Sequence, residues 1–421
     1  MNKSMEEKEK EMAKKKDIKK IEVERFPTGS SVLDCILSEG RDTPSGYPIK
    51  VMGLESESMA GKTRLALEMI YEAYKSYGKD NVEILFLDGE SGMSIDTESC
   101  YGFTLTHGGN IKSIKTLEQL QVETVQFCRN KDPKKLGIVI WDSVDAFTTA
   151  STESNYDERA KQYKKDGDIK AIKTYGMEKP KLLSEMMPMI TSEADASRTL
   201  VLAIQQVREN INAGPFGKKT RTSGGKAIRF YTSVGFGLRR ADIFGEKDRE
   251  IGYLLELTGI KTRTKYERRK AYIVVNHETG FDAVKSDLIF LYDLVADNTK
   301  LNVPKSKALK WDAVWDSTKA TEEADAVTSE EYKEFIKDND LADNIKEEYG
   351  NLIAKNVKAY INDTPEVQAL FIEKFGVMDL DTLCSYIEKN NLEEELAWRV
   401  KDKFFSIEEA LQPKDRKSRK L

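Results

Sequence analysis

The residues best placed to do chemistry are Gly61, Lys62 and Thr63, which end a glycine-bearing turn. An apolar run at residues 49–52 comes before this turn, and a stretch of helical composition, residues 64–70, follows it. A strand, a loop that ends in Gly-Lys-Thr and a helix are the parts of a phosphate-binding loop. Backbone N–H groups at the start of such a helix face the phosphates, and the helix dipole favours their negative charge.

Each side chain of such a loop has its own task. Lys62 would reach the β- and γ-phosphates of a nucleotide, and the Thr63 hydroxyl would hold Mg²⁺. The loop departs from the usual G-x-x-x-x-G-K-[ST] spacing, because Ser56 stands where the first glycine is expected and Gly53 lies three residues earlier. Two interpretations follow: either Ser56 takes the turn position, or the loop contains a three-residue insertion.

Carboxylates that follow two apolar runs form the second candidate group. Residues 84–88 are followed closely by Glu90, and residues 137–142 end in Asp142. The carboxyl ends of parallel strands meet at one edge of a sheet, so both acids would lie near the phosphate loop. Asp142 would orient Mg²⁺, and Glu90 would polarise an attacking water. The alternative is that each acid only caps the next helix, but two of them downstream of Gly-Lys-Thr favour nucleotide hydrolysis.

A third apolar run, residues 200–204, leads to Gln206, whose amide could bond the γ-phosphate and report its presence to the next segment. That segment, residues 207–226, is rich in glycine and basic residues, although the whole chain has a net charge of −5. Backbone N–H groups and basic side chains together suit a sugar–phosphate backbone, whereas charge alone would favour a solvated loop. The candidate DNA-binding residues are Arg208, Lys218, Lys219, Arg221, Thr222, Ser223, Gly224, Gly225 and Lys226.

Composition narrows the remaining possibilities. The chain has 421 residues, enough for two or three domains, and 33% of them are charged. With two histidines, histidine metal sites and Ser-His-Asp triads are nearly excluded, and four scattered cysteines indicate reduced intracellular thiols. The chain contains no apolar run of about 18 residues, so no membrane span is predicted. Its charged N-terminus has no apolar signal segment. We therefore expect a cytoplasmic protein without a membrane partner.

Alternating apolar runs and helical stretches predict an α/β core over residues 25–299. The expected strands are residues 49–52, 84–88, 137–142, 199–204, 233–238, 253–258 and 271–275. Short apolar runs separated by helices indicate a mostly parallel central sheet with helices on both faces. Two polar stretches, residues 155–179 and 209–226, are expected to be long loops.

Charge-rich segments flank this core. Residues 1–24 alternate Lys and Glu runs and are expected to form a helical arm, either frayed or docked on a neighbouring subunit. Residues 300–421 are expected to form a C-terminal acidic helical domain that ends in a basic tail.

Four segments resemble, in order, the RecA family of ATP-dependent DNA strand-exchange recombinases. Residues 26–34 look like the segment that enters the core, and residues 53–63 look like the family's phosphate loop with three residues inserted. Residues 138–146 resemble its Walker B strand. Residues 203–240 are the most specific, because they match nearly in register from Gln206 through residues 224–234 to Arg240. The resemblance covers residues 25–290 and implies a RecA-like P-loop NTPase core.

This resemblance implies an ATP- and Mg²⁺-dependent homo-oligomer, a helical filament on single-stranded DNA that pairs and exchanges strands with double-stranded DNA. By position it implies Lys62, Glu90 and Gln206 as catalytic residues, and Thr63 and Asp142 as magnesium ligands. The nucleotide-binding residues it implies are Gly53, Glu55, Ser56, Ala60, Gly61, Lys62, Thr63, Arg64, Asp142, Lys261 and Arg263. The last two would reach a neighbouring subunit's ATP. Residues 155–179 fall at the family's first DNA-binding loop, and Phe230 falls at an aromatic residue of subunit communication.

The acidic segment after residue 300 has no counterpart that we can place, and it could tune access of DNA by like-charge competition. Such divergence is typical of a phage-encoded form, which would act in the cytoplasm of an infected bacterium. Two other functions keep parts of this description. One is a RecA-fold ATPase that works as a helicase, replication partner or clock-type kinase; the other is a DNA-binding scaffold that does not hydrolyse ATP. The block at residues 224–231 favours a recombinase.

Overall fold

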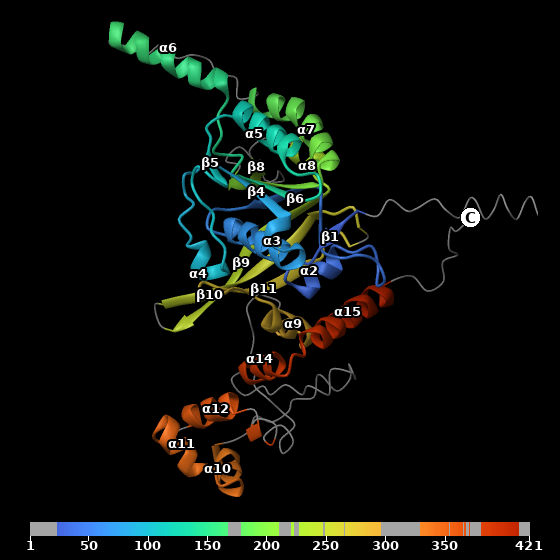
Figure 1. Cartoon of the computed structure of the whole chain (residues 1–421), viewed down its shortest axis with the longest axis vertical. Helices are drawn as coiled ribbons and strands as arrows, with labels where there is room; N and C mark the ends of the chain where they lie inside the picture. The colour runs from blue at the N-terminus through green and yellow to red at the C-terminus, as the bar shows by residue number, and fades with distance from the viewer. Residues whose placement is uncertain are drawn as a thin grey trace, which may run out of the picture.

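The computed structural model describes residues 23–166, 178–209, 220–222, 227–246, 249–264, 266–295, 329–352, 354–364, 366–367, 370 and 380–411. In these ranges a ten-stranded sheet forms the centre of the molecule (Figure 1). Its parallel part contains β3 (Val51–Ser56), β4 (Val82–Asp88), β5 (Ile111–Ser113), β6 (Leu136–Asp142), β7 (Thr199–Glu209) and β9 (Val234–Glu246). These strands lie in the order β5-β4-β6-β7-β3-β9.

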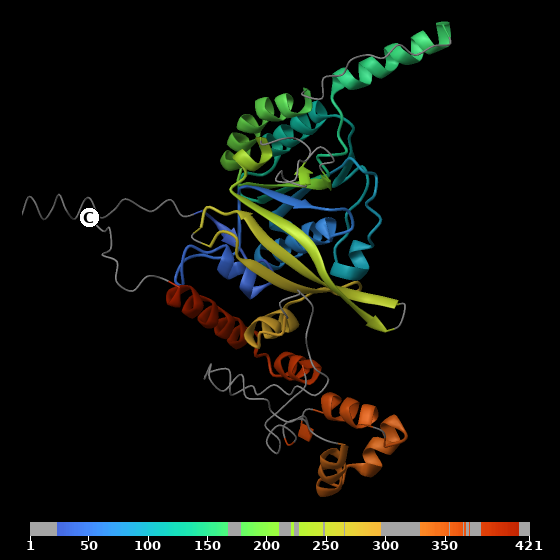
Figure 2. The ribbon, with the colours of Figure 1, turned by 180° about the vertical axis from the view of Figure 1, so that it is seen from behind.

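The other part of the sheet is antiparallel. β9 pairs with β10 (Arg249–Lys261) in a long hairpin that extends beyond the body of the molecule (Figure 2). β11 (Lys270–Asn276) and β12 (Gly280–Asp282) follow in the same sheet. All seven predicted strands are present, and the prediction of an α/β core with a mostly parallel sheet is confirmed.

Two apolar clusters cover the two faces of the sheet, and the alternation of side chains along β6 assigns each residue to one of them. Ile138 and Ile140 face the cluster that contains α2 (Ser31–Ile36), α3 (Lys62–Tyr77) and α9 (Ala283–Leu291). Val139 and Trp141 face the cluster under α5 (Leu117–Asn130), α7 (Glu178–Ala196) and α8 (Ala227–Tyr231). This period of two is the reason that β6 reads as a continuous apolar run.

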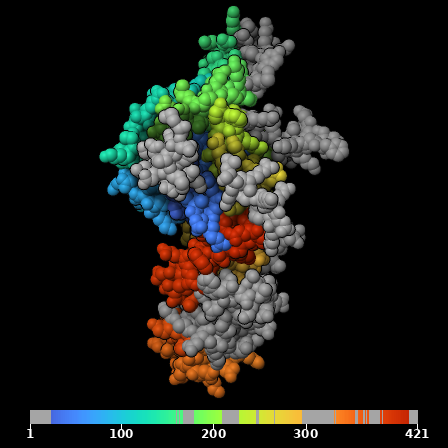
Figure 3. Space-filling view, turned by 90° about the vertical axis from the view of Figure 1, so that its right-hand side faces the viewer, coloured from blue at the N-terminus to red at the C-terminus, as the bar shows by residue number. Residues whose placement is uncertain are grey.

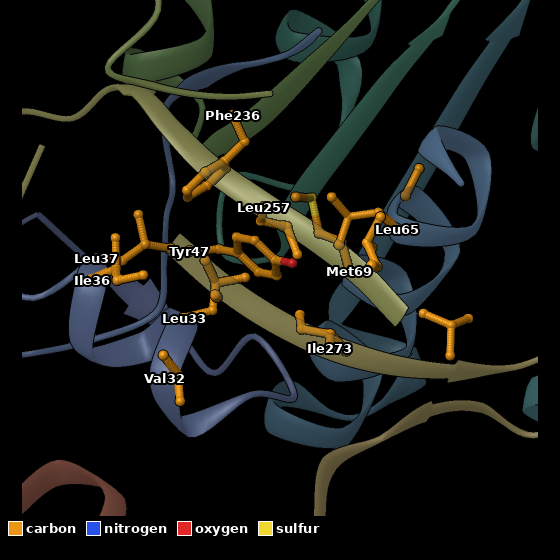
Figure 4. Packing of buried hydrophobic residues seen from close by; sticks show 14 of the residues in the cluster. Val32, Leu33, Ile36, Leu37, Tyr47, Leu65, Met69, Phe236, Leu257 and Ile273 are labelled. Atoms are coloured by element: carbon orange, nitrogen blue, oxygen red, sulfur yellow. The ribbon is translucent and has the colours of Figure 1, made fainter. Parts of the chain in front are cut away.

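The first cluster closes around Tyr47, which is fully buried in the short strand β2 (Tyr47–Pro48), paired with β1 (Arg25–Phe26). Figure 4 shows side chains of α2, α3, β9, β10 and β11 gathered around its ring. Segments far apart in the sequence therefore share one core.

The prediction of a polar loop at residues 155–179 is wrong over its first half, which is helical. α6 (Ala150–Asp166) is a helix that projects away from the sheet (Figure 1). Its Glu, Arg, Lys, Gln and Ala residues favour helix, but they carry no apolar periodicity that a sequence pattern could reveal. Residues 167–177 lie outside the described residues, and α7 begins at residue 178.

The expected loop at residues 209–226 also contains a strand. β8 (Thr220–Thr222) pairs antiparallel with the end of β7, so that Val207 lies opposite Thr222. β7 therefore continues past Gln206 to residue 209. The remaining residues of this stretch, including Lys218, Lys219 and the block at residues 223–226, lie outside the described residues, as do residues 1–22 of the expected arm.

The C-terminal segment contains helices in two different settings. α10 (Ser329–Asp338), α11 (Ala342–Tyr349) and α12 (Ala354–Asp363) share a small core of their own around Phe335 and Ile345. They lie at the opposite end of the molecule from α6 (Figure 3). α14 (Leu380–Lys389) and α15 (Glu393–Ala410) instead belong to the main cluster, through residues such as Leu383 and Val400. α14 and α15 therefore pack against the core, while the division of the chain at residue 300 stays a prediction. No helix in the described ranges is long and apolar enough to cross a membrane.

Candidate active site

The loop between β3 and α3 consists of residues 57–61. β3 pairs through Ser56 with both of its neighbours, opposite Gln206 on β7 and Leu238 on β9. Gly53 therefore lies inside a central strand and not in the loop. The interpretation that three residues are inserted in the loop is therefore wrong. The extra residues lengthen β3, where pairing in the sheet satisfies their backbone N–H and C=O groups. Ser56 takes the turn position, and the stretch from Ser56 to Thr63 has the usual length of a phosphate loop.

Gly61 caps the N-terminus of α3 with a φ of +92°, which favours glycine. A Cβ atom at this position would also lie 2.5 Å from the hydroxyl of Tyr253 on β10. The backbone conformation therefore favours a glycine here, and any larger residue would also have to displace the Tyr253 hydroxyl. Ala60 beside it is buried, whereas Met59 is 79% exposed.

Lys62 is buried at the first position of α3, and its ammonium group points into the loop. Its Nζ donates hydrogen bonds to the Glu57 carbonyl over 2.6 Å and to Ser56 Oγ over 3.1 Å. Burial lowers the pKa of Lys62, while the nearby carboxylates of Glu90, Asp142 and Asp145 oppose this shift. A buried cation that is short of water can exchange these partners for phosphate oxygens.

Thr63 and Asp142 join α3 to the end of β6. The Thr63 hydroxyl donates to Asp142 Oδ2 over 2.8 Å. Burial raises the pKa of Asp142 to about 6, and the negative charges of Glu90 and Asp88 add to this effect, whereas the Thr63 hydrogen bond opposes it. A nearby cation would reverse this shift and favour the ionised carboxylate.

Glu90 is held by two donors on one carboxylate oxygen. The Ser143 hydroxyl and the Gln206 side-chain amide both donate to Oε1, the amide over 3.2 Å. Asp88 sets the turn before it, because its Oδ1 accepts the backbone N–H groups of Glu90 and Ser91. The structure thus brings Glu90 and Gln206 into direct contact, and their catalytic roles stay predictions.

Gln205 and Gln206 point to opposite faces of β7, because side chains alternate along a strand. Gln205 is 2% exposed, whereas Gln206 lies on the side of Glu90. The backbone N–H of Gln206 donates to Asp145 Oδ2 over 2.6 Å. Of the two glutamines, only Gln206 is therefore placed to contact a phosphate bound at the loop.

Other predicted nucleotide-binding residues lie apart from this group. Glu55 forms a two-point ion pair with Arg229, at 3.2 and 2.8 Å. Arg64 donates to the Tyr101 hydroxyl over 3.2 Å and to the carbonyl of His277. Lys261 donates to the backbone carbonyls of Arg229 and Phe230, both over 2.7 Å, and Arg263 is exposed. The roles of these residues stay predictions, as do those of exposed Arg208 and of Arg221 and Thr222 in β8.

A cavity of about 450 Å³ opens on the β9 side of the phosphate loop. Its lining combines the loop residues Ser56 and Ala60 with Val207 and the arginines at positions 229, 239 and 240. The cavity therefore connects the phosphate loop with the start of the segment predicted to bind DNA.

Several residues of the site could not be found from motifs. Asp88, Ser143 and Asp145 were available as polar residues at the ends of apolar strands, and a buried acid in such a place is itself a signal. Tyr253 had no such signal, since its contact with Gly61 depends on the order of strands in the sheet.

The oxygen donors around Thr63 fit a magnesium ion that brings its own phosphate ligands. Among the described residues, no group of three or more His, Cys, Asp or Glu side chains could hold a metal ion by itself. Magnesium is usually bound by one or two carboxylates together with substrate phosphates. The Thr63 hydroxyl and the Asp142 carboxylate therefore suit a magnesium–nucleotide complex better than a free ion.

Comparison with known proteins gives a consistent result. The family model of the RecA N-terminal domain matches residues 1–282. The chain is 25% identical over 301 residues to the RecA protein of Mycoplasma mycoides, covering 69% of this chain and 79% of that protein. It is 31% identical over 250 residues to the RecA protein of Brucella anthropi and 32% identical over 250 residues to that of Rhizobium leguminosarum bv. viciae. These two matches cover 59% of this chain, and 60% and 62% of the relatives.

Proposed function

The chain belongs to the RecA family, and we propose that it is an ATP-dependent recombinase that forms a helical filament on single-stranded DNA and promotes homologous pairing and strand exchange. Its relatives support a RecA-type recombinase and imply a P-loop ATPase that binds DNA and oligomerises. The observation that carries the finer proposal is the contact of Glu90 with Gln206, one residue before the predicted DNA-binding segment.

Bound magnesium–ATP would supply the phosphoanhydride bond that is cleaved. Lys62 would leave the Ser56 and Glu57 oxygens and neutralise the β- and γ-phosphates, while Thr63 and Asp142 would hold the metal side of the nucleotide. Glu90, fixed through one oxygen by Ser143 and Gln206, would orient the attacking water and accept its proton.

The same contact gives a route from nucleotide to DNA. A γ-phosphate that draws the Gln206 amide away from Glu90 would move the last residues of β7, which pair with β8 in the predicted DNA-binding segment. Linkage requires that DNA then tightens ATP binding by the same factor. DNA affinity should also fall steeply with salt, because the contacts are mostly to phosphates.

Two measurements test this function together. ATP turnover is measured with and without single-stranded DNA, and the protein is viewed by electron microscopy with ATP and single-stranded DNA. We expect DNA-stimulated turnover and helical filaments. Turnover without filaments or strand exchange would indicate a RecA-fold ATPase with another task, and DNA binding without turnover would indicate a scaffold.

A further inference from the structure

Asp145 replaces a missing strand partner at the end of β7. The pairing of β6 with β7 ends at Trp141 and Ala203, so β6 offers no acceptor to Gln206. The Asp145 carboxylate reaches across and accepts the Gln206 N–H over 2.6 Å. An exposed peptide group would otherwise depend on water at this edge, so this carboxylate sets the backbone position of Gln206.

Lys179 fixes the same segment from the other side. It lies at the second position of α7, and its Nζ donates to the backbone carbonyls of Asp145 over 3.0 Å and Phe147 over 2.8 Å. Burial lowers the pKa of Lys179, and the charge of Asp145 opposes the shift. The start of α7 is therefore attached to the Asp145 segment by one half-buried ammonium group.

The base of α6 is attached to the same place. The Ser151 hydroxyl in the first turn of α6 donates to Glu178 at the start of α7 over 2.6 Å. The Glu118 carboxylate of α5 accepts the Ala150 N–H over 3.1 Å. Since α6 projects from the body of the molecule, a partner that moves α6 acts on its base, where Asp145 lies a few residues away (Figure 1).

Lys179 lies near charges from two other segments. The charge of Asp145 raises the pKa of Lys179, and the charge of Arg208, two residues after Gln206 on β7, lowers it. DNA phosphates near Arg208 would change the charge balance at Lys179, which holds the Asp145 segment. The ammonium group that holds the Asp145 segment is therefore sensitive to the start of the predicted DNA-binding segment.

We propose that Asp145 is a positioning residue that couples the α6–α7 pair to the catalytic glutamate. The contacts run from Lys179 through Asp145 and Gln206 to Glu90, and each is a direct hydrogen bond. The inference rests on the proposed function, because it assigns Glu90 to hydrolysis. It adds an input that reaches Gln206 through its backbone N–H and not through the γ-phosphate.

Hydrogen–deuterium exchange tests the coupling without any activity. Asp145→Ala should raise exchange of backbone amides at residues 203–209 at least about tenfold, whereas Asp145→Asn should stay close to wild type because its Oδ1 can still accept the Gln206 N–H. Lys179→Met should raise exchange at residues 203–209 as well as at 145–151. Unchanged exchange at 203–209 in either Asp145→Ala or Lys179→Met would overturn the proposal.

Turnover provides the second measurement. If wild type shows DNA-stimulated ATP turnover, Asp145→Ala should lose about tenfold in stimulated kcat with KM for ATP changed less than about threefold, and Asp145→Asn should recover most of the loss. Asp80→Ala, at an exposed acid beyond α3, is the matched control and should match wild type. Full stimulation in Asp145→Ala would contradict the coupling. A wild type without turnover would instead refute the proposed function, and exchange alone would then decide the inference.

Discussion

The hydroxyl of Thr63 lies 2.8 Å from Asp142 Oδ2, although the two residues are 79 positions apart in the chain. This hydrogen bond places the first turn of α3 against the end of β6. The two oxygen ligands predicted for magnesium are therefore preorganised, and little backbone movement is needed to complete the site.

Lys62→Ala should abolish ATP turnover and weaken ATP binding at least about tenfold, because residues 56–61 of the loop contain no other cation that could neutralise the β- and γ-phosphates. Isothermal titration with a non-hydrolysable ATP analogue measures the affinity. Lys75→Ala, at an exposed position of the same helix, is the control and should leave both properties unchanged. Wild-type turnover in Lys62→Ala would mean that the loop is not the catalytic site.

Glu90→Gln should retain ATP binding within about threefold and reduce kcat at least about a hundredfold, because the amide keeps the hydrogen bonds but cannot accept a proton from water. Ser143→Ala removes one donor to Glu90 Oε1 and should cause a smaller loss. Single-turnover kinetics separate binding from chemistry. Normal hydrolysis in Glu90→Gln would assign the base to another residue.

Gln206→Ala should keep ATP binding but lose most of the ATP-dependent tightening on DNA, since the amide that contacts Glu90 is the expected γ-phosphate sensor. The measurement is affinity for single-stranded DNA with a non-hydrolysable ATP analogue and with ADP. If the mutant retains the full difference between the two nucleotides, the signal passes through Arg208 or another residue of the segment.

Asp287→Asn should stabilise the protein more at pH 8 than at pH 5. Asp287 is 3% exposed, and burial raises its pKa to about 7, with further contributions from nearby Asp34 and Asp282 and an opposing hydrogen bond from Ser31. The unfolded chain releases this proton near pH 4, so the folded state loses stability as pH rises from about 4 to 7. The neutral amide avoids this loss, and the gain should differ by about 2 kcal/mol between the two pH values. Urea unfolding at both pH values checks the sign, and an equal gain would contradict it.

Phe404→Ala in α15 should destabilise the main core by about 3 kcal/mol or more, because its ring packs against Tyr266, Phe290 and Phe405. Ile407→Ala on the same helix changes a 43% exposed side chain and should cost less than about 1 kcal/mol. Calorimetry with both variants tests whether α15 belongs to the core. Equal small effects would return α15 to a separate C-terminal domain.

Local patterns predicted much of the fold and the centre of the site. The strands that end in Asp88 and Asp142 are continuous apolar runs, and Lys62 and Thr63 belong to a motif contained in a few residues. The extra length of β3 could not be seen, because only pairing with β7 and β9 decides whether residues 53–56 are strand or loop. α6 was missed because an exposed helix needs no apolar stripe, and the contact of Asp145 with Gln206 depends on where β6 stops.

The position of α15 in the main core has a consequence for synthesis on the ribosome. Arg41 near the N-terminus bonds to Asp402, 361 residues later, and among the described residues α14 and α15 pack on the apolar sides of α2 and α9. At about 5–20 residues per second, translation from residue 291 to 411 takes on the order of ten seconds. During that time these apolar surfaces remain open to solvent and to other nascent chains. Protection of unfinished chains by a chaperone should therefore affect the yield of folded protein more than the intrinsic folding rate of the sheet does.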